Sequence, residues 1–153
     1  MLHFAYGANM HGAVMHQHAP CAEPIGVARL DGFRFIVTAD GYASVAPARA
    51  QRVYGVMWRL TPRDRATLDA WENVAGGLYR AEIVPVRQAG RRHPALIYLA
   101  RQRPCGRPRP GYMEIVVKAA RQWELPAAYI ANLERWLPRR RLGAGHRKLV
   151  LRF

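Results

Sequence analysis

The sequence predicts an α+β fold in which helices accompany a mixed or barrel-like sheet. Short apolar segments of strand character come first, one helical segment lies among them, and two helical segments come last. A doubly wound sheet would instead alternate strands and helices throughout. With 153 residues, the chain has the size of one ordinary domain and can bury a hydrophobic core. We therefore expect a single domain over residues 1–153, of which 138–153 form a basic C-terminal tail.

The N-terminal third is expected to be mostly strand. Residues 2–6 are apolar and aromatic and stop at Gly7, which is typical of a buried strand that ends in a tight turn. Residues 11–21 are rich in histidine, and we expect them to be irregular. The next strand covers residues 25–37, where an Asp-Gly pair at 31–32 signals a hairpin turn or a bulge. Further strands are expected at 42–48, 52–60, 78–86 and 93–100.

One helix is expected between these strands, and two follow them. Thr61 is a good N-cap residue and Pro62 fits the first helical turn. The helix should carry Leu68 and Trp71 on its apolar face and stop near the glycine pair at 76–77. The last two helices are expected at 111–123 and 126–136, after a basic loop rich in proline and glycine at 101–110.

Positive charge is the most unusual feature of the composition. The chain has 24 lysine and arginine residues against 10 aspartate and glutamate residues, a net charge of +14. Such a surplus attracts nucleic acid, acidic lipid and carboxylate substrates alike. The bases are almost all arginine, however, and Ser44 is the only serine, so coding bias could also explain the surplus. We expect no specific nucleic-acid partner.

Several common functional classes lack their signatures here. The sequence has no GxSxG, no GxxxxGK[ST] and no GxGxxG motif, which argues against serine hydrolases, P-loop enzymes and dinucleotide-binding enzymes. Cys21 and Cys105 are far apart and form no CxxC pair. No apolar run approaches the roughly 20 residues of a membrane helix, and no secretory signal is evident. We expect a cytoplasmic protein without membrane attachment.

The segment FAYGANM at residues 4–10 is the first candidate site. A strand that ends in Tyr-Gly-x-Asn can place consecutive backbone N–H groups at the edge of a sheet, where they could bind a carboxylate or an oxyanion. Gly7 would allow an unusual φ value or a close approach, and Asn9 could hold the loop. An ordinary β-turn with its usual glycine and asparagine explains the same residues.

Glu72 is the second candidate. It follows Trp71 near the end of the expected helix, and Val74 comes two residues later. Apolar neighbours of this kind could desolvate the carboxyl group partly, raise its pKa and suit it to proton transfer near neutral pH. A solvated carboxylate at a helix end is the alternative.

Two further clusters carry weaker signals. His11, His16, His18 and Cys21 could bind Zn²⁺ or Ni²⁺, but their spacing matches no usual zinc pattern, so we expect an exposed loop and no metal site. The basic residues of the tail, from Arg139 onward, could contact phosphate groups. No aromatic platform accompanies them, so we favour a solvated tail or a subunit contact through residues 149–153.

Four segments in order resemble the gamma-glutamylcyclotransferase family, including its AIG2-like proteins, over nearly the whole chain. Residues 4–10 look like the family's Tyr-Gly-Ser-Asn-Leu/Met loop, and residues 27–33 (VARLDGF) resemble the strand pair that follows. Residues 43–86 are similar to the central block, with its V-x-G-V-x-W-x-L strand and L-D-x-x-E helix. Residues 108–136 look like the C-terminal helix pair, with Gly-Tyr opening the first helix and L-P-x-x-Y starting the second.

The resemblance implies a compact mixed β-barrel with flanking helices and a pocket between the N-terminal loop and the catalytic helix. By position, the family's acid/base glutamate falls on Glu72, and Tyr79 and Tyr129 match aromatic positions that line or support the pocket. The γ-glutamyl group would be bound mainly by backbone N–H groups of five loop residues: Tyr6, Gly7, Ala8, Asn9 and Met10.

The implied activity is release of 5-oxoproline from a small γ-glutamyl amine or amino acid, by a monomer or homodimer, without metal or other cofactor. The alternative is a non-catalytic binding module on the same fold that uses its basic surface for an acidic partner or nucleic acid. Three departures affect the substrate. Ala8 replaces the family's serine, Met10 does not fit the Leu-x-Trp pattern of the glutathione-specific ChaC-type branch, and the histidine-rich residues 11–18 replace a segment that more usually contains arginine.

Overall fold

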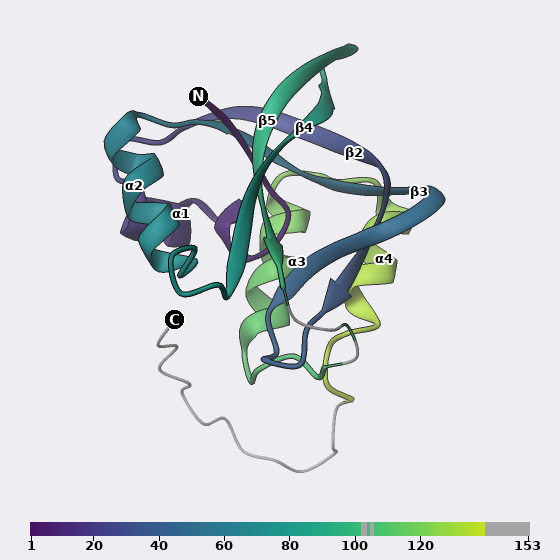
Figure 1. The fold of residues 1–153 in the computed structure, drawn as a ribbon. Coiled ribbons are helices and arrows are strands. Elements are labelled where there is room, and N and C mark those ends of the chain that lie inside the picture. The colour runs from purple at the N-terminus through teal and green to yellow at the C-terminus, as the bar shows by residue number, and fades with distance from the viewer. Residues whose placement is uncertain (102–103, 105, 140–153) are drawn as a thin grey trace.

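The computed structural model describes residues 1–101, 104 and 106–139, and its centre is a closed five-stranded barrel (Figure 1). The strand order is β1-β3-β2-β4-β5, and β1 closes the barrel by pairing with β5 in parallel, while the other pairs are antiparallel. The predicted α+β fold with a mixed barrel is thereby confirmed. The strands are β1 (Leu2–Ala5), β2 (Glu23–Val37), β3 (Ala43–Arg59), β4 (Tyr79–Gln88) and β5 (Arg91–Ala100).

Strand β3 corrects one prediction, because the two short strands expected at 42–48 and 52–60 form one strand of 17 residues. The polar residues between them suggested a break. They remain extended because β3 pairs with β2 along most of its length, and the resulting ribbon carries exposed residues at this point. Across the Asp-Gly pair at 31–32 the register shifts, and Gly32 has a φ of 81°. This pair therefore forms a bulge, one of its two predicted alternatives.

The histidine-rich segment corrects a second prediction, since residues 11–21 are not irregular throughout. A short 3₁₀ helix, η1 (Ala8–Met10), leads into helix α1 (Gly12–His18). The N-cap residue His11 forms no capping side-chain bond, so the sequence gives little local signal for this helix. The helix buries Met15 and His18 against the rest of the protein, and a helix of seven residues depends on such tertiary contacts.

Helix α2 (Pro62–Trp71) begins as predicted. The backbone N–H of Asp64 donates to Thr61 Oγ1 over 3.1 Å, and the N–H of Thr61 donates to Asp64 Oδ2 over 3.2 Å, which forms a capping box. The helix ends earlier than the expected glycine pair. Leu68 is fully buried, whereas Trp71 is 41% exposed and does not belong to the core.

The two C-terminal helices are confirmed with shorter bounds, as α3 (Tyr112–Gln122) and α4 (Ala127–Glu134). They lie on a different side of the barrel from α1 and α2 (Figure 1). Helix α3 contacts both η1 and α4, so it supports the loop that follows β1. Arg140 and the rest of the expected tail lie outside the described residues, as does Cys105.

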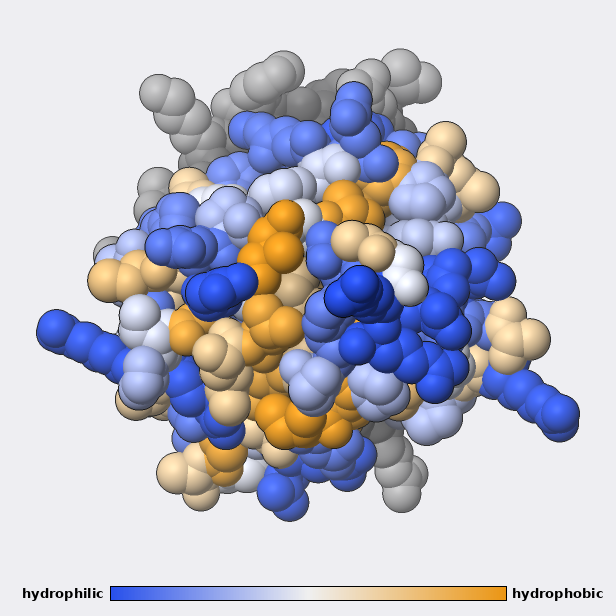
Figure 2. Space-filling view, turned by 90° about the horizontal axis from the view of Figure 1, so that it is seen from above, coloured by the Kyte–Doolittle hydropathy of each residue, from blue (hydrophilic) through white to orange (hydrophobic). Residues whose placement is uncertain are grey.

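The surface is mostly hydrophilic. Figure 2 shows one face on which hydrophobic side chains gather in a central band between hydrophilic flanks. Among the described helices, none is both long enough and apolar enough to cross a membrane.

Candidate active site

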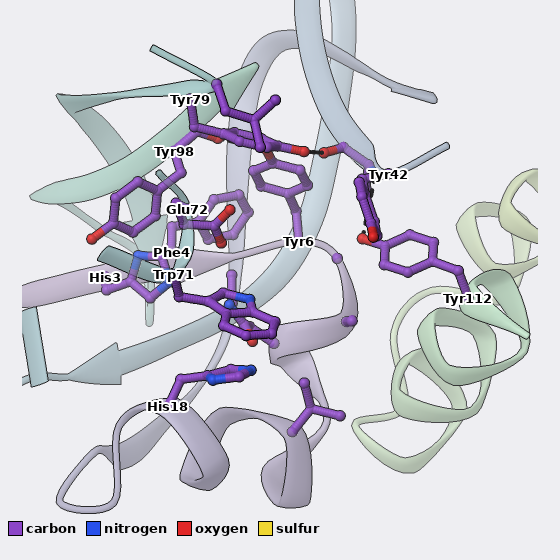
Figure 3. Close-up of a pocket in the computed structure, with 17 residues that line it drawn as sticks. His3, Phe4, Tyr6, His18, Tyr42, Trp71, Glu72, Tyr79, Tyr98 and Tyr112 are labelled. Atoms are coloured by element: carbon purple, nitrogen blue, oxygen red, sulfur yellow. Dashed lines mark hydrogen bonds between the residues drawn. The ribbon is translucent and has the colours of Figure 1, made fainter. Parts of the chain in front are cut away.

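A cavity of about 280 Å³ opens where the end of β1 meets α1, the end of α2 and the barrel strands (Figure 3). Its inner wall is formed by buried aromatic side chains, among them Phe4, Tyr6 and Tyr98. Half-buried residues of the loop after β1 and of the segment after α2 form its mouth. The cavity therefore lies between the N-terminal loop and the end of helix α2.

Glu72 directs its carboxyl group into this cavity, beside Trp71 and Tyr6 (Figure 3). It is the C-cap residue of α2, and its N–H donates to the carbonyl of Leu68 over 2.8 Å. This bond fixes the backbone position from which the side chain extends. Among the described residues, none forms a hydrogen bond or ion pair with the carboxylate. Burial among aromatic walls raises the pKa of Glu72 to about 7. Near neutral pH this group can therefore both accept and donate a proton.

Three residues of the loop after β1, Gly7, Ala8 and Asn9, line the same cavity. Within the described part of the chain, the N–H groups of Gly7 and Asn9 take part in no hydrogen bond. The next N–H groups are used inside the turn, where Met10 donates to the carbonyl of Gly7 over 3.1 Å and His11 donates to that of Ala8 over 3.0 Å. Backbone N–H groups without a partner in the protein are suited to bind a carboxylate or an oxyanion.

Gly7 is required for close packing. Its φ of −111° lies outside the left-handed region that favours glycine. A Cβ atom at this position would lie 2.7 Å from the hydroxyl oxygen of Tyr112 and 3.3 Å from the Cβ of Ala43. Of the two roles considered for this glycine, the structure shows the close approach.

A network of tyrosines fixes the inner wall. The hydroxyl of Tyr6 donates to the carbonyl of Tyr98 over 2.5 Å, and the hydroxyl of Tyr98 donates to Asp69 Oδ1 over 2.7 Å. Asp69 also pairs with Arg65 at 3.0 Å. Burial raises the pKa values of Tyr6 and Tyr98 well above the ordinary value, so both side chains stay neutral.

Tyr79 and Tyr112 complete the wall on the side of β3. The hydroxyl of Tyr79 donates to the carbonyl of Ala43 over 2.9 Å, whereas the hydroxyl oxygen of Tyr112 accepts from the N–H of Ala43 over 3.3 Å. The N–H of Ala8 also bonds to Tyr112, and this bond favours the ionised form. Burial has the larger effect and raises the pKa of Tyr112 to about 12. Tyr112 thus connects α3 to both the loop and β3.

Two histidines reach the cavity in the neutral form. His3 is buried, its Nδ1 lies 2.9 Å from the carbonyl oxygen of Leu96, and burial lowers its pKa to about 4. His18 stacks on Trp71 with ring centroids 3.8 Å apart, and burial lowers its pKa as well. Among the described residues, the lining contains no lysine and no arginine, and Glu72 is the only one of them that carries charge near neutral pH.

Six of the eight residues predicted for the site line this one cavity: Tyr6, Gly7, Ala8, Asn9, Glu72 and Tyr79. Met10 and Tyr129 do not. Met10 is fully buried behind the loop, and its carbonyl accepts a hydrogen bond from Nε1 of Trp123 over 2.9 Å. Tyr129 borders a second hollow and packs edge-to-face on Tyr54, 5.3 Å away.

Other lining residues were not identified from the sequence. Alternation along β5 would have placed Tyr98 on the same face as Leu96, which is a usable signal. Tyr112 belongs to the Gly-Tyr pair that opens α3, but nothing in the sequence gave it a role. The stacking of His18 on Trp71 joins two helices and has no local sequence signal.

The histidine and cysteine cluster forms no metal site. Across residues 1–101, 104 and 106–139, no group of three or more potential ligands is close enough to hold a metal ion. His16 lies 2.9 Å from the carbonyl oxygen of Ala22 through its Nε2, His18 stacks on Trp71, and Cys21 is exposed.

Comparison with known proteins agrees with this geometry. The model of the AIG2-like family matches residues 52–133, and the matched segment contains Glu72, Tyr79 and Tyr112. The human and mouse proteins named gamma-glutamylcyclotransferase are each 28% identical to the chain over 144 residues, which cover 87% of this chain and 77% of theirs.

The fold is also shared with solved structures. One named gamma-glutamyl cyclotransferase superposes with a TM-score of 0.84 at 27% sequence identity, covering 94% of this chain and 92% of its own. An uncharacterised human protein superposes with a TM-score of 0.82 at 28% identity, covering 94% of this chain and 91% of its own. Because the family model matches more than half of the chain and the superposition covers 94% of it, this protein belongs to the AIG2-like family.

Proposed function

We propose that this protein is a gamma-glutamylcyclotransferase that releases 5-oxoproline from a γ-glutamyl compound. One observation carries the proposal: Glu72, with a pKa near 7, lies in an aromatic cavity that Gly7 and Asn9 also line. The names of the human and mouse relatives support the same reaction.

The reaction is an aminolysis within the substrate. Glu72 in its ionised form takes a proton from the α-ammonium group, and the free α-amine attacks the γ-carbonyl carbon. A C–N bond forms and closes the five-membered ring. The protonated Glu72 then donates to the leaving nitrogen as the original amide C–N bond breaks, and the ring nitrogen gives up its surplus proton, through the carboxylate, to the released amine. One carboxyl group serves as base and then as acid, which requires a pKa close to the working pH.

The loop and the tyrosines serve to bind and orient the substrate. In this proposal the N–H groups of Gly7 and Asn9 hold the α-carboxylate or the oxyanion that forms at the γ-carbonyl. Tyr6 and Tyr79 are neutral and bonded to backbone carbonyls, so they shape the cavity and keep water out. A folded substrate brings the amine close to its own carbonyl, which lowers the entropic part of the barrier.

The proposed reaction uses no metal ion and no cofactor, because the nucleophile belongs to the substrate. Met10 and Tyr129 would act from outside the cavity, Met10 by supporting the loop and Tyr129 by supporting β3. We also propose a cytoplasmic site of action on small molecules.

Mass detection of 5-oxoproline tests the proposal. The protein is incubated with γ-glutamyl amino acids and γ-glutamyl amines, and we expect 5-oxoproline and the free amine in equal amounts. In the variant Glu72→Gln the rate should fall by about 10²–10⁴, because the amide cannot transfer the proton. Glu82→Gln is the matched control, since Glu82 lies on the surface beside Arg80, and it should keep full activity. If no substrate yields 5-oxoproline, the alternative of a binding module is favoured.

A further inference from the structure

The mouth of the cavity is lined mainly by uncharged, largely apolar side chains. The inner wall is buried, and the half-buried or exposed lining residues mark the opening. Beyond the loop and Glu72, these residues are Val14 from α1, Tyr42, Trp71 and Leu78. All four side chains are uncharged: Val14 and Leu78 are branched aliphatic, and Tyr42 and Trp71 are aromatic.

The leaving amine must face this opening. Under the proposed function, the loop holds the γ-glutamyl group and Glu72 reaches the bond that breaks. The cavity has a volume of only about 280 Å³, so a substituent on the leaving nitrogen has to extend outward. Its path passes Trp71, which is adjacent to Glu72 and 41% exposed.

Trp71 is held in place as a platform. His18 covers one face of the indole, with a centroid distance of 3.8 Å and an angle of 22° between the rings. His18 itself is only 9% exposed, so the stack is anchored on the body of α1. In Figure 3 the ring of Trp71 lies between His18 and Glu72, and thus toward the reacting bond. A fixed aromatic surface binds an apolar group with little loss of conformational entropy.

None of the described residues that line the cavity is lysine or arginine, although the whole sequence has 24 of them. Three described arginines lie beside the site without lining it. Arg65 pairs with Asp69 at 3.0 Å. Arg101, whose N–H bonds to the carbonyl of Leu78, is exposed.

The third, Arg109, lies over the ring of Tyr42 at the opening, 4.9 Å from its centroid, and its Nε donates to the carbonyl of Asp40 over 2.9 Å. This guanidinium is therefore held against an aromatic face and a carbonyl group. A carboxylate on the leaving amine would lose water beside Trp71 without gaining a cation from the described lining, and it would repel ionised Glu72.

We propose that the site selects γ-glutamyl conjugates of uncharged amines that carry an aromatic or branched aliphatic group, and discriminates against γ-glutamyl amino acids. This inference rests on the proposed function and names its substrate class.

The test uses two pairs of substrates, each pair differing only in a carboxylate on the leaving amine. The pairs are γ-glutamyl-phenethylamine with γ-glutamyl-phenylalanine, and γ-glutamyl-ethylamine with γ-glutamyl-alanine. We expect kcat/KM for 5-oxoproline release to be at least tenfold higher for the uncharged member of each pair, and higher for phenethylamine than for ethylamine. Equal values, or a preference for the carboxylate, would overturn the inference and leave the proposed function standing. No release from any of the four would defeat both.

Variants identify the residues that cause the preference. Trp71→Ala should reduce the ratio of kcat/KM for γ-glutamyl-phenethylamine over γ-glutamyl-ethylamine, mainly by raising KM for the aromatic substrate. Val14→Arg places a cation at the opening. It should lower the ratio of kcat/KM between the uncharged and the carboxylate member of each pair at least fivefold. Ala13→Arg adds the same charge to an exposed position of α1 outside the lining and should leave the ratio unchanged. Arg101→Gln should also leave it unchanged. If Arg101→Gln changes the ratio of kcat/KM within a pair, this arginine binds the leaving group, which contradicts the proposal.

Discussion

At the scale of single residues, the decisive property is the environment of Glu72. A carboxyl group at a helix end is ordinarily solvated and ionised at neutral pH. Here the fold surrounds it with aromatic side chains and the described lining supplies no cation, so the ionised form loses hydration without compensation. The result is a group that can exchange a proton near pH 7, which the proposed reaction needs.

The raised pKa predicts how stability depends on pH. The folded pKa is about 7 against an ordinary value of 4.5, so between these values the folded state binds a proton that the unfolded state has lost. Stability from this group is therefore full below about pH 4.5 and is lost as the pH rises through 7. Glu72→Gln should be more stable than the parent at pH 8, by on the order of 1–3 kcal/mol, and the difference should vanish near pH 4.5. Urea unfolding at the two pH values measures this, and an equal difference at both would contradict it.

The loop gives a second residue-scale prediction. Gly7→Val should abolish activity, because its Cβ would overlap the hydroxyl of Tyr112, 2.7 Å away. Gly7→Ala in a Tyr112→Phe background should be less damaged than Gly7→Ala alone, since the overlapping oxygen is removed. Steady-state kinetics and thermal unfolding of the single and double variants measure the coupling, and strictly additive losses would refute the packing argument.

Ala8→Ser separates the backbone of the loop from its side chains. If N–H groups hold the substrate, restoring the family's serine should change turnover less than about threefold, a difference below ~0.7 kcal/mol. A larger gain would mean that the hydroxyl contributes directly.

At the scale of elements, α2 is positioned by its own first turn. Asp64 is 2% exposed, completes the capping box with Thr61 and also accepts from the N–H of Cys21 over 3.3 Å. It thereby links the segment after α1 to the start of α2, and these two helices carry His18 and Trp71. The stack at the cavity mouth thus depends on contacts at the far end of α2.

This linkage predicts that Asp64→Ala costs more stability than Thr61→Ala. The threonine variant loses one capping bond, about 1 kcal/mol, whereas the aspartate variant also leaves the N–H groups of Thr61 and Cys21 without their acceptor. Thr67→Ala is the control, because Thr67 is exposed and bonds only to the carbonyl of Arg63 in its own helix. Denaturant unfolding gives the three values, and equal losses for Thr61→Ala and Asp64→Ala would show that the link to Cys21 has no energetic effect.

At the scale of the whole molecule, the net charge of +14 predicts how the protein binds polyanions. Binding to DNA or RNA should be weak, independent of sequence and steeply dependent on salt, because counterion release would drive it. Fluorescence anisotropy with several oligonucleotides between about 50 and 200 mM salt measures the slope. Nanomolar affinity for one sequence at physiological salt would instead promote the binding-module alternative.

The sequence by itself determined the order of elements, the start of α2 and the candidacy of Glu72. These features depend on signals within a few residues: alternating apolar residues, a Thr-Pro pair before a helix, and an acid between apolar neighbours. The family resemblance added the barrel and the loop. The same local reasoning failed for α1, which has no capping side chain, and for β3, whose exposed middle resembles a turn.

Only the tertiary structure decided which residues meet at the cavity. Gly7 lies close to Tyr112, which is 105 positions away in the sequence, and Tyr6 donates to the carbonyl of Tyr98, 92 positions away. His18 stacks on Trp71 of another helix. Barrel closure and helix packing bring these pairs together, and neither leaves a pattern in neighbouring residues. The pKa of Glu72 follows from the same closure, because desolvation depends on everything that surrounds the group and not on the residues next to it in the chain.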